Sequence, residues 1–129
     1  MESISYIVCT HNPSILERCL VKSLLLLEDD EIVVVQKQQS IAQGYNTGID
    51  LAKNKIKCFI HHDIIITNPH LLRMNLLAYC VDDIGIVGIV GSKTEASPWW
   101  EGQCVGSVLD PRSGILYFSD GKEFCLHLD

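Results

Sequence analysis

The sequence predicts an α/β fold, in which alternating β-α-β units build a mostly parallel sheet with helices on both faces. Two observations predict it. Short apolar runs rich in β-branched residues alternate with longer segments whose apolar residues recur at helical spacing. Polar or turn-forming residues follow each run, as at the exits of strands. From Gly91 onward Gly, Ser, Pro and Trp dominate, which predicts an irregular C-terminal tail with short strands.

The first predicted strand is Ile4 to Cys9, and Thr10-His11-Asn12-Pro13 forms its exit turn. A helix is expected from Ser14, with Asn12 or Ser14 as its cap. Its apolar positions extend through Leu24 and Leu27, and the acidic run Glu28-Asp29-Asp30 is expected to end it. The run Glu31 to Val35 is continuously β-branched, which favours a parallel strand covered on both faces.

A second helix is expected from Ile41 to near Lys53-Asn54-Lys55, followed by a strand over Lys57 to Ile60. Gly44 and Gly48 lie on one side of this helix, which is compatible with close packing on the sheet or with close approach of a ligand. The later elements follow in order along the chain. They are a helix from Asn68-Pro69 to about Tyr79, a buried strand over Ile84 to Val90, and short strands at Gly106 to Leu109 and Ile115 to Phe118.

Size and composition fit one compact domain covering residues 1–129. Of the 129 residues, 47% are hydrophobic and 20% are charged, which suffices for a core. No apolar run approaches the roughly 20 residues that span a bilayer, and no basic stretch precedes an apolar one at the N-terminus. We therefore expect a cytoplasmic protein without a membrane span. The six cysteines occur singly, which indicates reduced core residues.

The charge of the chain restricts its partners. A net charge of -6 argues against a nucleic-acid surface, because such surfaces rely on clustered Lys and Arg. Small anions remain compatible, since helix N-termini and a divalent cation hold phosphate without a basic surface. Neither a Gly-x-Gly-x-x-Gly motif nor a Gly-Lys-Ser/Thr loop is present, which excludes the dinucleotide fingerprint and the P-loop.

Open parallel sheets bind ligands beyond the carboxyl ends of their strands. Four loops are expected to line one crevice at that edge: residues 10–12, 36–38, 61–63 and 91–93. Asp63 is the main candidate there, because a carboxylate can hold Mg²⁺ or Mn²⁺ and thereby a diphosphate. The alternative is that Asp63 only caps a turn.

A zinc site is a further possibility at this edge. His61 and His62, with His11 or His70 nearby, offer imidazole ligands, but their spacing matches no zinc motif. Neighbouring residues of a strand face opposite sides, so His61 and His62 are not expected to point at one metal.

The order and spacing of four motifs carry a resemblance to a known family. They are Thr-x-Asn at the first strand exit, Glu-Ile-Val-Val-Val, Ser-Ile-Ala-x-x-x-Asn-x-Gly-Ile, and a strand that ends in His-His-Asp. Over Ile4 to Gly106 the chain resembles the donor-binding half of family 2 glycosyltransferases, which have the GT-A (Rossmann-like) fold. It resembles a subgroup that has His-x-Asp in place of Asp-x-Asp.

The resemblance implies binding of a nucleotide-diphosphate sugar with a divalent cation, Mn²⁺ or Mg²⁺, held by Asp63 and His61. Gln36 stands where the family commonly has an aspartate that reads the base, and Tyr45 where it has a basic residue. Because glutamine offers both a donor and an acceptor, a UDP-sugar is the first expectation. The donor-binding residues so implied are Thr10, Asn12, Gln36, Asn46, His61, His62, Asp63 and Trp100.

Transfer of a hexose to an acceptor, still unknown, also needs a general base. No carboxylate near the end of the chain matches that base, so the chain is expected to be truncated before the acceptor-binding part, and no catalytic residue is assigned. The alternatives are an inactive nucleotide-sugar-binding module and a structural interaction module. A homodimer is compatible with the open sheet edge. A response-regulator receiver domain is disfavoured, because Thr10-His11-Asn12 lacks the acidic pair that it needs.

Overall fold

The computed structural model describes residues 2–80, 82, 84–88, 91–92, 104–105, 107–110 and 115–118. The chain divides into two compact units, residues 1–78 and residues 79–128. Each unit is described by itself. No helix in these described ranges is long and apolar enough to cross a membrane.

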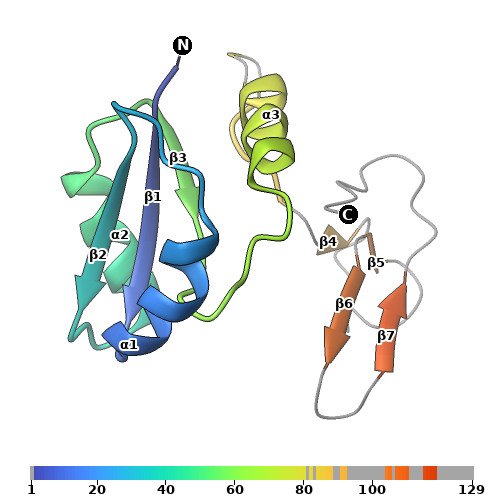
Figure 1. Cartoon of the computed structure of the whole chain (residues 1–129), viewed down its shortest axis with the longest axis horizontal. Coiled ribbons are helices and arrows are strands. Elements are labelled where there is room, and N and C mark those ends of the chain that lie inside the picture. The colour runs from blue at the N-terminus through green and yellow to red at the C-terminus, as the bar shows by residue number, and fades with distance from the viewer. Residues whose placement is uncertain are drawn as a thin grey trace. The chain divides into compact units, whose positions relative to one another are not determined.

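The first unit is built on a parallel sheet of three strands in the order β2-β1-β3 (Figure 1). The strands are β1 (Ile4–Thr10), β2 (Glu31–Gln36) and β3 (Ile56–Phe59). In the register, Thr10 pairs with Gln36 and Ile7 pairs with Phe59. The predicted parallel α/β architecture is confirmed, with each strand within one residue of its expected bounds.

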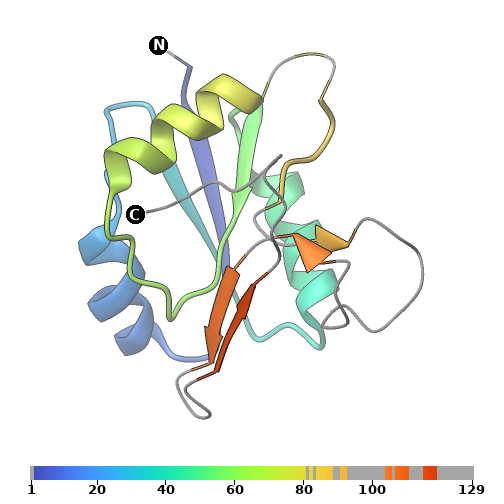
Figure 2. The ribbon, with the colours of Figure 1, turned by 90° about the vertical axis from the view of Figure 1, so that its right-hand side faces the viewer.

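The core lies on both faces of β1, whose residues from Ile4 to Val8 are almost completely buried. On one face Val8 packs with Leu16, Leu20 and Ile60, and on the other Ile7 packs with Val33 and Val35. Helix α1 (Pro13–Leu16) covers the first of these faces and helix α2 (Ile41–Leu51) the second (Figure 2). Helices on both faces of the sheet were predicted, and the structure has them.

The first helix ends earlier than the apolar spacing predicts. Asn12 caps α1, and the helix continues only as the π-helix η1 (Glu17–Val21) to about Ser23. The Ser23 hydroxyl donates to the carbonyls of Cys19 and Leu20 and accepts from the Ile66 amide, which ties the helix end to a later segment. The expected continuation through Leu24 and Leu27 was therefore wrong.

Strand β2 is also less covered than predicted. Val33 and Val35 are buried, but Val34 between them is 40% exposed. Within the described sheet β2 pairs only with β1, so one edge of it has no neighbouring strand. The face that carries Val33 and Val35 is thus fully covered, whereas the opposite face is covered only in part, where Ile32 packs on the Val8 cluster.

Helix α2 resolves the question of its two glycines in favour of packing. Gly44 and Gly48 are buried, and a Cβ at Gly44 would lie 2.5 Å from the Cys9 sulfur. A Cβ at Gly48 would overlap Cγ2 of Ile7. The glycines let the helix backbone lie directly on β1, whereas Ile41 and Ile49 are exposed.

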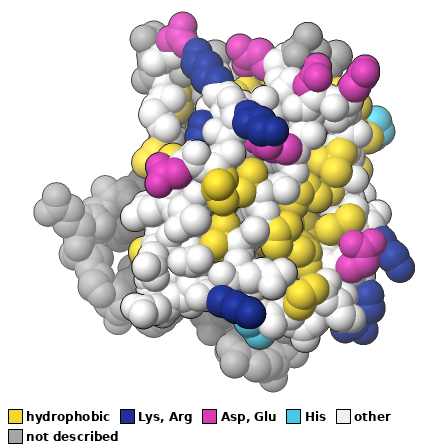
Figure 3. Space-filling model, turned by 90° about the vertical axis from the view of Figure 1, so that its left-hand side faces the viewer, with side chains coloured by type: hydrophobic (Ala, Val, Ile, Leu, Met, Phe, Trp, Pro, Cys, Tyr) yellow, Lys and Arg dark blue, Asp and Glu magenta, His cyan; other side chains and the backbone are white. Residues whose placement is uncertain are grey.

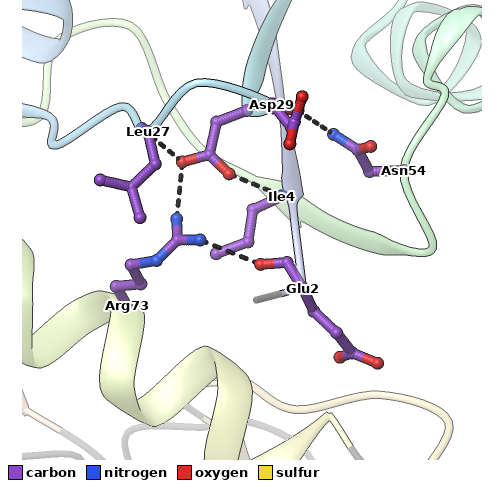
Figure 4. A network of polar contacts seen from close by, with 7 residues as sticks. Glu2, Ile4, Leu27, Asp29, Asn54 and Arg73 are labelled. Atoms are coloured by element: carbon purple, nitrogen blue, oxygen red, sulfur yellow. Dashed lines mark hydrogen bonds and ion pairs between the residues drawn. The ribbon is translucent and has the colours of Figure 1, made fainter.

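Helix α3 (Pro69–Tyr79) has the predicted bounds and is capped by Asn68, whose side-chain oxygen accepts from the Leu71 amide at 3.0 Å. Its Arg73 donates to Asp30 at 2.6 Å and to the carbonyl of Glu2 at 2.9 Å (Figure 4). Asp30 also accepts from the backbone amides of Ile4 and Leu27. Its side chain is fully buried, so Asp30 is a structural anchor and not the expected polar end of a helix.

In the second unit one predicted strand is missing. Residues 84–88 belong to no strand and are exposed, with Ile86 93% accessible, so a buried strand there was the wrong prediction. A strand needs a hydrogen-bonded neighbour, and these residues have none in the described part of the unit. Residues 89–90, the rest of that prediction, lie outside the described residues.

The described pairs of this unit are antiparallel. β4 (Gly91–Ser92) pairs with β5 (Cys104–Val105), and β6 (Ser107–Asp110) pairs with β7 (Ile115–Phe118). The two short strands predicted in the tail are thus confirmed as β6 and β7, the first shifted by one residue.

Candidate functional site

The carboxyl ends of the three parallel strands bring three of the four predicted loops together. Thr10 and Gln36 are direct register partners at the ends of β1 and β2. The Ile60 amide donates to the Ile7 carbonyl at 3.0 Å, which places residues 61–63 beside the exit of β1. The fourth loop belongs to the second unit, and its Lys93 lies outside the described residues.

Thr10 and His62 form the closest polar contact at this edge. The Thr10 hydroxyl lies 2.6 Å from Nδ1 of His62 and accepts a hydrogen bond from the Asn12 amide at 3.0 Å. Thr10 is only 5% exposed, which shields these bonds from competing water. Of the predicted residues, Thr10 is therefore in direct contact both with His62 and with the backbone of Asn12.

Asn12 is the N-cap residue of α1, where the sequence allowed either Asn12 or Ser14. Its side-chain oxygen accepts from the Ile15 amide at 3.2 Å and so caps α1. An asparagine side chain also carries two N–H donors. In Asn12 the oxygen serves the helix, and the NH₂ group is the part that can serve a ligand.

Exposure alternates along the segment that follows β3. Ile60, His62, Ile64 and Ile66 are buried or half-buried, whereas His61, Asp63 and Ile65 are exposed. The inward isoleucines pack on the Val8 core cluster, and the His62 ring lies 4.8 Å from that of His11. His61 and His62 thus differ in exposure as predicted. His61 and Asp63 are both exposed to solvent.

The remaining predicted residues are not drawn into this cluster. Gln36 is exposed at the end of β2, its side chain makes no hydrogen bond with the described residues, and its carbonyl accepts from the Gln38 side-chain amide at 3.3 Å. Asn46 is exposed on α2 and makes no side-chain hydrogen bond with the described residues. Tyr45 packs edge-on against Phe59, and burial raises its pKa. Trp100, with Trp99, lies outside the described residues.

A comparison with known families shows the family of the chain. The family described as "Glycosyltransferase like family" matches residues 5–123. The chain belongs to this glycosyltransferase-like family. The resemblance to family 2 glycosyltransferases is thereby confirmed, and the match includes every predicted donor-site residue from Thr10 to Trp100. Searches of curated proteins and of solved structures gave no match.

Mg²⁺ or Mn²⁺ suits the residues at this edge better than Zn²⁺ does. In the described residues, no group of three or more His, Cys, Asp or Glu side chains could hold a metal ion, so a closed zinc site has no support there. Mg²⁺ commonly takes only one or two carboxylates and fills its other positions with phosphate and water. The exposed Asp63 carboxylate, which has no hydrogen bond within the described part, fits such a ligand.

Two features of this candidate site were not revealed by the sequence: the Thr10–His62 bond and the contact of the His62 ring with His11. One signal was available for the first of them. His62 stands two residues after the buried Ile60, and alternate residues of an extended segment share a side. That spacing predicts an inward His62, although it does not identify Thr10 as its partner.

Proposed function

We propose that this protein is a glycosyltransferase of the hexosyltransferase type that binds a nucleotide-diphosphate sugar through a divalent cation, Mn²⁺ or Mg²⁺. The observation that carries the proposal is the joint exposure of Asp63 and His61 beside Thr10, in a chain of the glycosyltransferase-like family. Asp63 supplies the hard carboxylate, and His61 is the second protein ligand. The cation then neutralises the charge that builds on the departing diphosphate.

The nucleoside end of the donor is assigned to the exits of β1 and β2. Gln36 has an exposed side chain, and its register partner Thr10 lies beside it at the end of β1. A glutamine can donate to and accept from a pyrimidine edge, so a UDP-sugar is the first substrate to test. Asn12 and Asn46 add amide groups near the nucleotide, and Trp100 is assigned to the sugar.

Transfer requires a base that removes the proton of the acceptor hydroxyl while the cation holds the diphosphate. We assign no residue to this role, and the acceptor is likewise unassigned. The proposal therefore separates two steps: donor binding by the residues above, and transfer when a base is supplied. A protein that binds the donor without turnover is the alternative that the second step tests.

The first experiment measures donor binding. Calorimetric and thermal-shift titrations with UDP, GDP and their sugars, with and without Mn²⁺, should show stabilisation that depends on the metal. Asp63→Asn should weaken metal-dependent binding by at least about tenfold, because it removes the charged ligand. Asp50→Asn is the matched control, since Asp50 is exposed in the last turn of α2. Hydrolysis or transfer measured in the same tube separates the enzyme from the binder.

Two results would contradict the proposal. One is that no nucleotide stabilises the wild-type protein in the presence of Mn²⁺. The other is that Asp63→Asn and Asp50→Asn bind with the same affinity as the wild type.

A homodimer also remains part of the proposal. The edge of β2 is open within the described sheet, and hydrophobic side chains gather on the face of the molecule that carries β2 (Figure 3). Val34, at 40% exposure, is the apolar residue of this strand edge that a second copy would cover. Light scattering after size exclusion should give twice the mass of one chain, and Val34→Lys should lower it to that of a monomer.

A further inference from the structure

The backbone link between β1 and β3 ends before the site begins. Its register stops at the pair Ile7 and Phe59, and the Ile60 amide makes the next bond, to the Ile7 carbonyl. Beyond this point β1 continues to Thr10, while the segment that follows β3 turns at residues 62–63. The Thr10–His62 contact is the side-chain bond that joins the two exits.

His62 is restrained from several sides. Its Nδ1 lies 2.6 Å from the Thr10 hydroxyl, which the Asn12 amide holds in place. One side of the imidazole lies against the His11 ring at 4.8 Å. Thr10 is itself buried at the end of the central strand, so the contact ties the turn to the rigid part of the sheet.

The neighbours of His62 are the two proposed cation ligands. His61 and Asp63 are both exposed, whereas His62 is half-buried between them. A fixed ring at position 62 therefore determines the direction in which both neighbours leave the backbone. Residues that orient metal ligands in this way commonly affect metal affinity as strongly as weak ligands do.

We propose that His62 is a positioning residue: it holds the turn through Nδ1 so that Asp63 and His61 face the cation, and it does not bind the cation or the nucleotide itself. This inference rests on the proposed donor-binding function. Within the His-His-Asp triplet, His62 then holds the turn from the inside, and His61 and Asp63 are the two exposed ligands.

Asparagine and glutamine provide a matched pair of variants for the test. The asparagine side-chain amide places a polar atom where His62 has Nδ1, and the glutamine amide places one where it has Nε2. His62→Asn should keep the bond to Thr10, with an affinity for Mn²⁺ plus nucleotide within about threefold of wild type. His62→Gln and His62→Ala should lose about ten- to a hundredfold. The probe is UDP or GDP, whichever the wild type binds more tightly, in calorimetric titrations with Mn²⁺.

Thermal unfolding without ligand provides the second readout. Positioning predicts that the loss of affinity in His62→Gln exceeds that in His62→Asn even when the two variants unfold at the same temperature. Manganese-induced relaxation of the imidazole protons should be stronger for His61 than for His62.

Three outcomes would overturn the inference while the proposed function stands. They are tighter binding by His62→Gln than by His62→Asn, wild-type binding by both variants, and an affinity loss that only follows the loss of stability. The first would make His62 a direct ligand through Nε2. Absence of nucleotide binding by the wild type itself would overturn the proposed function and this inference together.

Discussion

At the level of single residues, Tyr6 is one of the largest side chains that the described core buries completely, at 1% exposure. Burial raises the pKa of its phenol from 10.0 to about 12, with the nearby Cys58 and Asp30 adding to the effect. Arg73 acts in the opposite direction, because a cation favours the phenolate. The phenol therefore resists ionisation in the folded protein.

The stability of the protein should consequently fall in strong alkali. The unfolded chain ionises Tyr6 near pH 10 and the folded chain only near pH 12, so its stabilising effect is complete below pH 10 and is lost between these values. In Tyr6→Phe this part of the pH dependence should disappear from urea unfolding curves measured up to pH 12. Tyr79→Phe is the control, because Tyr79 is exposed. An unchanged pH profile in Tyr6→Phe would show that the phenol is hydrated.

Single residues also show how far the sequence predicts the site. Asp63 and Thr10 were identified because polar residues at strand exits converge in a parallel sheet. The distinct positions of His61 and His62 followed from alternation. The hydrogen bond between Thr10 and His62 could not be predicted, because it joins residues 52 positions apart. It also depends on where the backbone pairing of β1 with β3 ends.

At the level of elements, the two glycines of α2 determine how closely the helix packs on the sheet. Gly48 faces Ile7, and Gly44 faces Cys9. An alanine favours an isolated helix over glycine by about 1 kcal/mol. On this face the added methyl group has no room, and forcing one into a packed core typically costs about 1–3 kcal/mol.

A Cβ at Gly48 would overlap Ile7, so the upper half of this range applies, about 2–3 kcal/mol. Once the helical gain of about 1 kcal/mol is subtracted, Gly48→Ala should destabilise the protein by about 1–2 kcal/mol in urea unfolding. Gly85→Ala is the matched control, because a Cβ there meets nothing within 4 Å. It should leave the stability unchanged or slightly increased. A neutral Gly48→Ala would mean that α2 moves away from the sheet at little cost.

Elements were predicted well where the pattern within a segment determines the structure. α2 and α3 carry caps, Ser40 and Asn68, that match their apolar spacing. The predictions for the end of the first helix and for a strand from Ile84 were wrong for a different reason. Their ends depend on partners elsewhere, such as the Ile66 amide at Ser23, and apolar spacing cannot report those partners.

At the level of the whole molecule, one ion pair ties together distant parts of the first unit. Arg73 and Asp30 are 7% and 0% exposed, and their bonds connect α3 to the N-terminus and to the start of β2. Charged residues are almost never buried in this way unless paired. Both residues look like surface residues in the sequence, so their meeting depends on the tertiary fold.

Arg73→Met should destabilise the unit by about 3–5 kcal/mol, because it leaves the Asp30 carboxylate buried without its counter-charge. Arg18→Met, at an exposed arginine, should change the stability by less than about 0.5 kcal/mol. Adding Asp30→Asn to Arg73→Met should recover part of the loss, since the buried charge is removed. Urea unfolding of the wild type, Arg73→Met, Asp30→Asn and the double variant forms the cycle, and strictly additive effects would contradict a direct coupling.

The central place of β1 also affects the order in which the chain can fold during synthesis. β1 leaves the ribosome before β2 and β3, yet both of these strands pair with it. Its pairing with β2 can be complete once Gln36 has emerged, but Ile4 must wait for Ile56 and Ile7 for Phe59. One long edge of β1, the most buried strand of this sheet, is therefore open until the third strand is made, and during that interval a chaperone or a neighbouring nascent chain can compete for it.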